Sequence, residues 1–466
     1  MRFPLWLMIL AALTGLGLVL IAGTLILQPP QALILDATFS EETISPNADG
    51  DNDITRFAYD LSRGATVSLI FEAADGTVFD FRRDEPRIPQ TYSVLFSGVV
   101  AGYTLPDENI PGMIERRLIP EGDYTWRFIA ENENEREERS GTLTITDADS
   151  DLPIINTFTV GPDTFSPNQD GIDDRVEISV DLAKASELRV VLIDENDIET
   201  PIAARKEGRE QGEQGRHTFD YEGGIDLGAD PPPDGTYTLL AVAQDAVGQR
   251  IRRETTLTIE QGGKPRAEIA AQSVGVDVVF DVFAYDENYY SELDAIGAPV
   301  MQPNDPDSLS LTAITMPIGD VLVFKLTVEN YSDVPIRTTG PVPGTVYQQN
   351  QLASSLGNFD SSGAWRVGIQ CETSSESFPY RWAIGADDVL ETVIDDETGE
   401  AFKYLPPQSQ AVVWGGIRMT DIQERQNPQT CRAGLIHEDV AVSLRNSFVG
   451  AREIELVDPG ATVDDE

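Results

Sequence analysis

The sequence predicts an all-β protein in which tandem β-sandwiches follow a single N-terminal transmembrane helix. Three observations predict it: an uncharged apolar run near the N-terminus, an internal repeat whose two copies both show strand periodicity, and the lack of any other long segment with helical spacing. The 466 residues exceed one ordinary hydrophobic core, so we expect roughly two to four domains. With 41% hydrophobic residues, the chain is able to bury such cores.

The apolar run covers residues 5–27 and contains no charged side chain. A helix of that length rises far enough to cross the hydrocarbon core of a bilayer, with membrane lipid as its partner. A cleaved secretory signal is the alternative, but its apolar part is shorter and ends at a small-x-small site that this run lacks. Arg2 is the only charge before Asp36, so the positive-inside rule predicts a single-pass protein of the cell membrane with a cytoplasmic N-terminus and an extracytoplasmic bulk.

The strongly acidic composition excludes some classes of binding partner. Lysine and arginine number 33 against 79 acidic residues, for a net charge of −46. Phosphate recognition needs a basic face, and the chain contains neither a phosphate-binding loop nor a dinucleotide fingerprint, so we expect no nucleic-acid or nucleotide partner. A well-solvated surface, adaptation to high salt and attraction of divalent cations all remain consistent with this composition.

An internal repeat sets the domain organisation. Residues 45–53 (SPNADGDND) recur as residues 166–174 (SPNQDGIDD), at an offset of 121 positions. Residues 120–125 (PEGDYT) recur as residues 233–238 (PDGTYT), at an offset of 113 positions. The first copy therefore carries eight extra residues between these landmarks. The predicted parts are the N-terminus with its anchor (1–35), module 1 (36–150), module 2 (151–262), a C-terminal all-β domain (263–457) and an acidic tail (458–466).

Strand periodicity extends through all three predicted domains. Apolar and polar residues alternate over 124–130 and 237–241, and Tyr124 and Tyr237, each two residues after a turn glycine, are expected at tyrosine corners. In the C-terminal domain, the segments 276–287, 321–330, 411–420 and 440–446 continue the alternation. Within 321–330 one face is predicted to carry Leu322, Phe324, Leu326 and Val328.

These motifs resemble a known family. The order FSPNQDGIDD, then a strand, then DGTYTLLAVAQDAVGQ is similar to the Ig-like domain of flagellar hook-capping proteins and to Ig-like modules of secreted bacterial surface proteins. Residues 154–260 match closely and residues 37–146 more loosely, with EGDYT in place of DGTYT. The resemblance implies a seven-stranded Ig-like sandwich. The assembly segment of hook-capping proteins has no counterpart here, so the resemblance implies a fold and not a flagellar role.

The two repeated turns are candidate calcium sites. Several oxygen-bearing side chains gather around one glycine, as Ca²⁺ requires, but the glycine position and the lack of a closing glutamate differ from an EF-hand. The alternative is a structural turn in which these side chains cap backbone N–H groups. Ile172 stands where the first copy has an aspartate, so the first turn should bind more tightly. The candidate ligands are Asn47, Asp49, Asp51, Asp53, Asn168, Asp170, Asp173 and Asp174.

The chain has two cysteines, Cys371 and Cys431, and both fall in the C-terminal domain. An even number in an oxidising compartment predicts a disulfide, with two separate buried thiols as the alternative.

Catalytic motifs are missing: there is no nucleophile elbow or zinc-protease motif, His217 is expected in an exposed hairpin, and His437 has no second histidine at metal spacing. We therefore expect a protein that is not an enzyme.

Two functions fit these features. The first is a membrane-anchored structural or interaction protein that presents tandem Ig-like domains to another cell-envelope protein or a surface polymer. The second is a cell-surface glycan-binding or hydrolase-accessory protein whose C-terminal domain is the binding unit. In the second case Trp365, Trp382 and Trp414 would form a sugar-stacking platform, although tryptophans of β-sandwiches are commonly buried. Whether these indoles are exposed to solvent distinguishes the two functions.

Overall fold

The computed structural model describes most of the chain. Residues 1–3 and 27, at the two ends of the predicted anchor segment, lie outside the described part, as do 459 and 461–466 of the predicted tail. The described residues are 4–26, 31–204, 210, 212–271, 275–287, 300–307, 311–356, 361–395, 398–442, 444–458 and 460.

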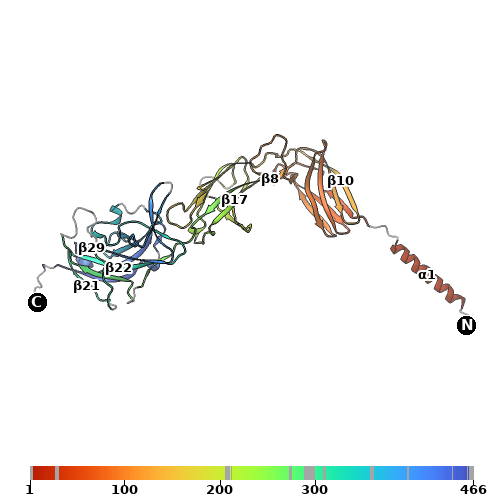
Figure 1. Cartoon of the computed structure of the whole chain (residues 1–466). Coiled ribbons are helices and arrows are strands. Elements are labelled where there is room, and N and C mark those ends of the chain that lie inside the picture. Colours follow the sequence, from red (N-terminus) through yellow and green to blue (C-terminus); the bar gives the residue numbers. More distant parts are fainter. Residues whose placement is uncertain are drawn as a thin grey trace. The chain divides into compact units, whose positions relative to one another are not determined.

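The apolar run forms helix α1 (Leu5–Ile26) (Figure 1). Several of its large apolar side chains are exposed, among them Trp6, Leu13 and Leu18. Among the described residues, no helix is both long enough and apolar enough to span a membrane. Beyond α1, the regular secondary structure of the described chain is strand, as predicted, apart from the short 3₁₀ turns η1 (Ile225–Leu227), η2 (Ala353–Leu356), η3 (Glu424–Gln426) and η4 (Leu444–Asn446).

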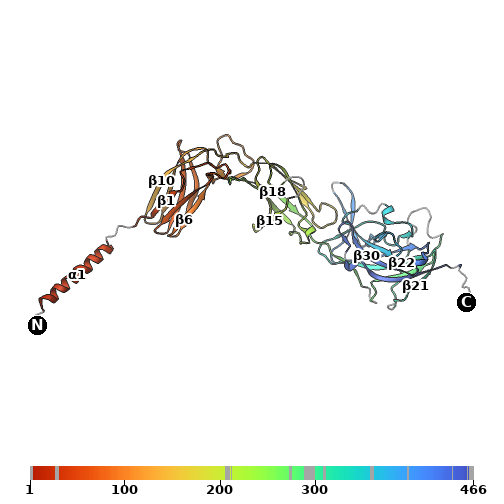
Figure 2. The same cartoon turned by 180° about the vertical axis from the view of Figure 1, so that it is seen from behind.

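Module 1 is a sandwich of two sheets with strand orders β1-β3-β6 and β2-β10-β9-β4-β5. Figure 2 labels β1 and β6 of the first sheet and β10 of the second. Alternate residues of each strand are buried, as in β3 and β9, because successive side chains of a strand point to opposite faces. The rings of Phe39, Phe57, Phe71, Phe96 and Trp126 fill the core. The strands are β1 (Ile34–Phe39), β2 (Thr43–Ile44), β3 (Thr55–Leu61), β4 (Ala65–Ala73), β5 (Val78–Arg87), β6 (Thr91–Phe96), β9 (Gly122–Glu131) and β10 (Arg136–Ile145).

Module 2 repeats this plan. Its short β12 runs parallel to β18, just as β2 runs parallel to β10, so the internal repeat is confirmed at the level of strand pairing. One sheet has the order β11-β13-β16, and the other contains β15-β14-β17-β18. The strands are β11 (Ile155–Gly161), β12 (Thr164–Phe165), β13 (Val176–Leu182), β14 (Glu187–Ile193), β15 (Glu199–Ile202), β16 (Gly215–Tyr221), β17 (Gly235–Gln244) and β18 (Arg250–Ile259).

The two modules share a sheet. After β6, module 1 continues into β7 (Val99–Ala101) and β8 (Met113–Leu118), and the segment from β6 to Pro120 is longer than its counterpart from β16 to Pro233. Strand β8 pairs antiparallel with β18, where Ile251 lies opposite Ile114. The resulting seven-stranded sheet has the order β15-β14-β17-β18-β8-β7, with β12 also paired to β18. The longer segment of the first copy therefore builds the link between the modules.

The C-terminal domain contains a five-stranded and a nine-stranded sheet, with orders β19-β22-β29-β24 and β21-β32-β30-β25-β23-β28-β27 plus three strands paired outside these paths. The strands are β19 (Ala267–Ala270), β20 (Val278–Phe283), β21 (Ile314–Pro317), β22 (Val321–Asn330), β23 (Ile336–Thr338), β24 (Val346–Gln348), β25 (Trp365–Cys371), β26 (Tyr380–Ala383), β27 (Glu391–Ile394), β28 (Ala401–Leu405), β29 (Ser409–Arg418), β30 (Gln429–His437), β31 (Ala441–Val442) and β32 (Val449–Val457).

The predicted apolar face of β22 is confirmed. Its members Leu322, Phe324, Leu326 and Val328 all join the main core of the domain. The expected strand over 440–446 is wrong beyond Val442. There the chain turns into η4, because the side chain of Asn446 donates a hydrogen bond to the carbonyl of Ala267 and anchors the turn on β19.

The described chain divides into two compact units. Unit 1 contains residues 1–159, 178–219 and 238–255, and unit 2 contains residues 160–177, 220–237 and 256–466. The boundary passes through module 2 for a physical reason. Its β18 pairs with β8 of module 1 in unit 1, whereas its turn 166–174 packs on the C-terminal domain in unit 2.

Candidate functional site

The first repeated turn, residues 45–53, is closed by the carboxylate of Asp53. Its Oδ1 accepts hydrogen bonds from the backbone N–H groups of Asn47 (3.0 Å) and Ala48 (2.7 Å). Its Oδ2 accepts one from Gly50 at 2.7 Å. Desolvation raises the pKa of the Asp53 carboxyl, but the backbone donors outweigh it and hold this pKa below its ordinary value.

Two smaller turns lie inside the same loop. The side-chain oxygen of Asn47 accepts the N–H of Asp49 at 3.0 Å, and Oδ1 of Asp49 accepts the N–H of Asp51 at 2.8 Å. Both are Asx-turns, which is the structural alternative that the sequence left open. The side chains of Asp49 and Asp51 remain exposed to solvent.

The second turn repeats the scheme with Asp174 in the closing position. Its Oδ1 accepts the N–H groups of Asn168 and Asp170, each at 3.2 Å, and its Oδ2 accepts that of Gly171 at 2.6 Å. Burial, followed by the neighbouring Asp170 carboxylate, raises the pKa of Asp174 to about 6. The exposed Asp173 has a positive φ of 49°, like Asn52 at the matching position of the first turn (54°).

Unlike the first turn, the second one is packed against the C-terminal domain within unit 2. Oδ2 of Asp170 accepts a hydrogen bond from the hydroxyl of Tyr404 at 2.9 Å, and both residues are buried. The Nε2 atom of His437 donates to the carbonyl oxygen of Gln169 at 2.7 Å, and the imidazole stacks on Trp365 with ring centroids 4.4 Å apart. Burial raises the pKa values of Asp170 and Tyr404 and lowers that of His437 to about 4.

Two glycines make this contact possible. A Cβ atom on Gly363 would lie 2.2 Å from the carbonyl carbon of Asp170, and one on Gly171 would lie 2.1 Å from the carbonyl oxygen of Ser362. Both distances are far below van der Waals contact, so the two backbones approach as closely as only glycine permits. The turn 166–174 is therefore part of the C-terminal packing surface of module 2.

Calcium binding stays a prediction. In the described part of the chain, no three His, Cys, Asp or Glu side chains are grouped so that they could hold a metal ion. The closing aspartates Asp53 and Asp174 direct their oxygens to backbone N–H groups, and Asp170 is bonded to Tyr404. The first turn keeps exposed carboxylates on Asp49 and Asp51, which is consistent with the expected preference for that turn.

The predicted cysteine pair forms a disulfide. Cys371 of β25 and Cys431 of β30 lie directly opposite each other in the antiparallel register, with an S–S distance of 1.96 Å and a Cα–Cα distance of 4.0 Å. Both are buried in the main core of the C-terminal domain.

The two tyrosine corners are confirmed. The hydroxyl of Tyr124 donates to the carbonyl of Pro120 at 2.6 Å, and that of Tyr237 donates to the carbonyl of Pro233 at 2.7 Å. In each module this bond ties the start of a central strand to the residue four positions before it.

The prediction that three tryptophans form a sugar-stacking platform is wrong. Trp382 is fully buried between Phe324 and Tyr347, and its Nε1 donates to the carbonyl of Thr345 at 3.0 Å. Trp365 is also buried. The half-buried Trp414 donates its own Nε1 hydrogen bond to a backbone carbonyl. The indoles are core residues because their strands point them inward.

The expected exposure of His217 is also wrong. The residue is 6% exposed, and its Nε2 donates to the carbonyl of Glu213 at 2.6 Å. It shares the inward face of β16 with Phe219 and Tyr221, since alternate residues of a strand point the same way.

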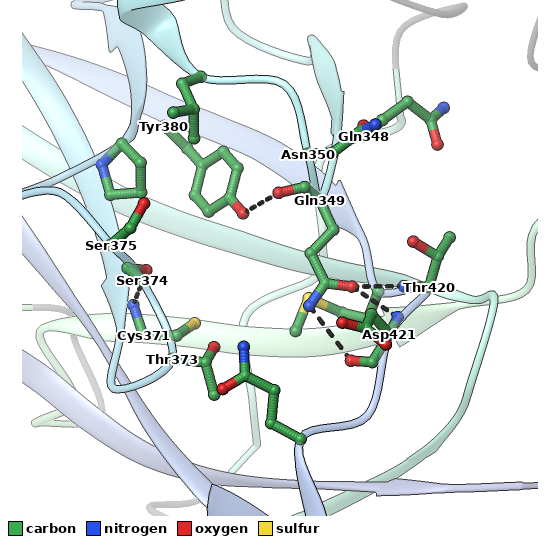
Figure 3. A pocket seen from close by; sticks show the side chains of 14 residues that line it. Gln348, Gln349, Asn350, Cys371, Thr373, Ser374, Ser375, Tyr380, Thr420 and Asp421 are labelled. Atoms are coloured by element: carbon green, nitrogen blue, oxygen red, sulfur yellow. Dashed lines mark hydrogen bonds between the residues drawn. The ribbon is translucent and has the colours of Figure 1, made fainter.

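A polar pocket of about 520 Å³ lies beside the disulfide and was not foreseen from the sequence. We call it the Gln349 pocket. It is lined by residues of four segments: 348–352, 371–375, 379–380 and 419–423. Figure 3 shows the side chain of Gln349 directed toward Thr420 and Asp421, and the hydroxyl of Tyr380 directed toward the Gln349 backbone. No motif marks the pocket, because its walls come from segments that are distant in the sequence.

Comparisons with known proteins give no family. No protein-family model and no curated protein sequence matches the chain. Among solved structures, it resembles a tetra-tandem repeat from the extending region of a large adhesion protein (12% identity over 87% of this chain and 71% of that one, TM-score 0.15). It also resembles three N-terminal domains of an outer capsid protein of bacteriophage RB49, with 10% identity over 91% of this chain and 99% of that one and a TM-score of 0.22. A further similar structure is that of Drosophila OTK extracellular domains 3–5, with 9% identity over 92% of this chain and 98% of that one and a TM-score of 0.17. TM-scores of this size support no argument about function.

Proposed function

We propose that the chain is a membrane-anchored, extracytoplasmic interaction protein that presents tandem Ig-like sandwiches to another cell-envelope protein or a surface polymer. The observation that supports this most strongly is the pairing of β8 with β18. Bending at this boundary would break the backbone hydrogen bonds of the pair, so a shared sheet stiffens the link between two modules. Modules coupled in this way suit a spacer that also offers binding surface.

The anchor in this proposal is the uncharged segment 5–27. Within it, the helix α1 exposes large apolar side chains such as Trp6 and Leu18. Exposed apolar surface is unfavourable in water and favourable in hydrocarbon, so lipid is the solvent that suits this helix. The charges at Arg2 and Asp36 favour a cytoplasmic N-terminus.

We also propose that the chain is not an enzyme. The groups with displaced pKa values at the second turn, namely Asp170, Asp174 and His437, are engaged in packing that turn. Among the residues that line the Gln349 pocket, Asp421 is the one carboxylate, and no histidine or lysine accompanies it. General acid–base catalysis needs at least one positioned group of suitable pKa.

The topology is tested by adding protease to intact cells, or to spheroplasts where an outer membrane exists. We expect digestion of residues 36–466 while cytosolic markers survive. A variant with Arg2→Glu, Asp36→Lys and Glu41→Lys reverses the charge difference across the segment and should protect part of the population. Complete protection of the unmodified chain would contradict the orientation, and a mature N-terminus beyond residue 22 would reveal a cleaved signal.

The interaction role is tested by cross-linking on intact cells, followed by isolation of the detergent-solubilised full chain. We expect a second envelope component to be cross-linked to residues of the modules or of the C-terminal domain. A glycan-binding function is the second candidate, and the Gln349 pocket is the observation that favours it.

A further inference from the structure

We propose that the Gln349 pocket binds a neutral saccharide. This inference deepens the proposed function by naming the ligand class of the C-terminal domain, and it depends on that function only for the extracytoplasmic location. The pocket volume of about 520 Å³ falls within the usual range for small-ligand sites and is enough for a short oligosaccharide end.

The wall of the pocket is held in place before any ligand arrives. Oε1 of Gln349 accepts the backbone N–H groups of Thr420 (2.7 Å) and Asp421 (2.8 Å), and its Nε2 donates to the carbonyl of Asp421 (3.2 Å). The hydroxyl of Tyr380 donates to the carbonyl of Gln349 at 2.7 Å. A wall fixed in this way loses little entropy on binding.

The opposite wall is equally constrained. Cys371 is tied to β30 by the disulfide, its N–H donates to Oγ of Ser374 at 3.1 Å, and the N–H of Ser374 returns a bond to its carbonyl at 2.9 Å. The hydroxyl of Thr373 donates to Oε1 of Gln429 at 2.6 Å. Figure 3 shows Cys371 and Ser374 on this side of the pocket, facing the Gln349 side.

Between these walls, several polar groups are available to a ligand. In the described part of the chain, the side chains of Gln348, Asn350 and Gln423 make no hydrogen bond to protein, and neither does the carboxylate of Asp421. Amides supply both donors and acceptors, and a carboxylate accepts, which is the combination that sugar hydroxyls require. Leu352, which also lines the pocket and is only half-buried, contributes apolar surface against which the carbon face of a sugar ring would pack.

Charge and backbone geometry narrow the ligand class. No lysine, arginine or histidine lines the pocket, and the chain carries a net charge of −46, so anionic polymers are repelled. An extended peptide would need a free strand edge, but the edge strand β24 has only three residues and the N–H of Gln348 at its end already donates to Oε1 of Gln351 at 2.9 Å, so little edge is available. A neutral polyhydroxylated ligand is the class that this lining fits best.

The test uses the purified full chain in detergent on an array of neutral glycans, with heparin and an unstructured acidic peptide as negative probes. We expect retention on one or more neutral glycans. The variant Asn350→Ala/Gln423→Ala removes two ligand-facing amides from exposed positions and should weaken binding by about tenfold or more, at about 1 kcal/mol for each lost hydrogen bond. The exposed Asn134→Ala in module 1 is the matched control and should bind like the unmodified chain.

Three results would overturn this inference. They are binding to none of the neutral glycans at millimolar concentration, undiminished binding by the double variant, and preferential retention of heparin or peptide. A thermal melt of the double variant, expected to match the unmodified chain, distinguishes lost binding from lost folding. The protease experiment on membrane topology is independent, because a chain with the opposite orientation would still bind glycan in detergent.

Discussion

The carboxylate of Asp170 accepts a hydrogen bond from the hydroxyl of Tyr404 at 2.9 Å, although the two residues lie 234 positions apart. Asp170 belongs to the turn that the sequence offered as a calcium site. Its burial against Tyr404 gives this turn a packing role that its counterpart in module 1, where Asp49 is exposed, does not share. The same local motif thus has two different surroundings.

Replacing Tyr404 by phenylalanine removes the donor and leaves the buried carboxyl of Asp170 without this bond. We expect the free energy of unfolding to fall by about 1–3 kcal/mol, the usual effect of an unsatisfied buried polar group. Urea denaturation of the full chain, followed by the fluorescence of the buried tryptophans, measures it. Tyr331→Phe, at an exposed position, is the control, and equal effects of the two variants would contradict the role of the buried bond.

The stability of this contact should depend on pH through His437. Burial lowers its pKa from 6.5 to about 4, so between these values the unfolded chain binds more protons and stability falls as the pH falls. The slope is at most about 1.4 kcal/mol per pH unit. Asp174 acts in the opposite direction, because its pKa rises from 3.8 to about 6 and stability is lost as the pH rises through that window.

The variant His437→Gln separates these two contributions. Its amide is able to donate to the carbonyl of Gln169 but does not titrate. In the unmodified chain the two contributions largely offset each other between about pH 4 and 6, so urea denaturation at several pH values between about 4 and 7 should show that acidification stabilises the variant relative to the unmodified chain. An unchanged pH profile would show that His437 does not control this slope.

Gly363→Ala should open the contact between the turn and the C-terminal domain, because the new methyl group would overlap the backbone of Asp170. Gly399→Ala is a matched control, since Gly399 has a similar φ (+72° against +79°) but no atom within 4 Å of a Cβ. Both variants carry the cost of a positive φ, about 1–2 kcal/mol, and only Gly363→Ala adds the overlap. Hydrogen exchange at residues 168–172 should accelerate in that variant alone.

Calcium should raise the melting temperature of the full chain through the first turn, and a chelator should lower it. Asp49→Asn keeps the acceptor for the N–H of Asp51 while removing the charge, so it should abolish the response without opening the turn. Asp53→Ala should destabilise module 1 with or without calcium, since it removes the acceptor of three backbone N–H groups. If millimolar Ca²⁺ produces no heat of binding and no shift of the melting temperature, calcium binding is contradicted and both turns are structural caps.

Removing the disulfide with Cys371→Ala/Cys431→Ala opens a loop of 60 residues and should cost about 4 kcal/mol of unfolding free energy by the chain-entropy estimate. Reductant should lower the melting temperature of the unmodified chain toward that of the variant and leave the variant unaffected. Alkylation of both cysteines in folded protein from its native compartment would show that the bond does not form there.

Local features of the sequence determined the architecture. Alternation of apolar residues placed β9, β17 and β22, because the period of a strand is a property of neighbouring residues. The repeated SPN-x-DG turns and the glycine–tyrosine corners likewise depend on residues a few positions apart, so their capping and tyrosine bonds could be anticipated. The count of two cysteines in one domain was enough to predict the pair.

Tertiary structure alone decided what each local motif faces. The sequence does not encode at short range that Asp170 meets Tyr404, that β8 pairs with β18, or that Trp382 is buried under β22. The Gln349 pocket also depends on segments that come together only when the two sheets of the C-terminal domain pack. Spacing along the chain specifies a turn or a strand, whereas contacts between distant segments arise from the packing that gives each side chain its partner.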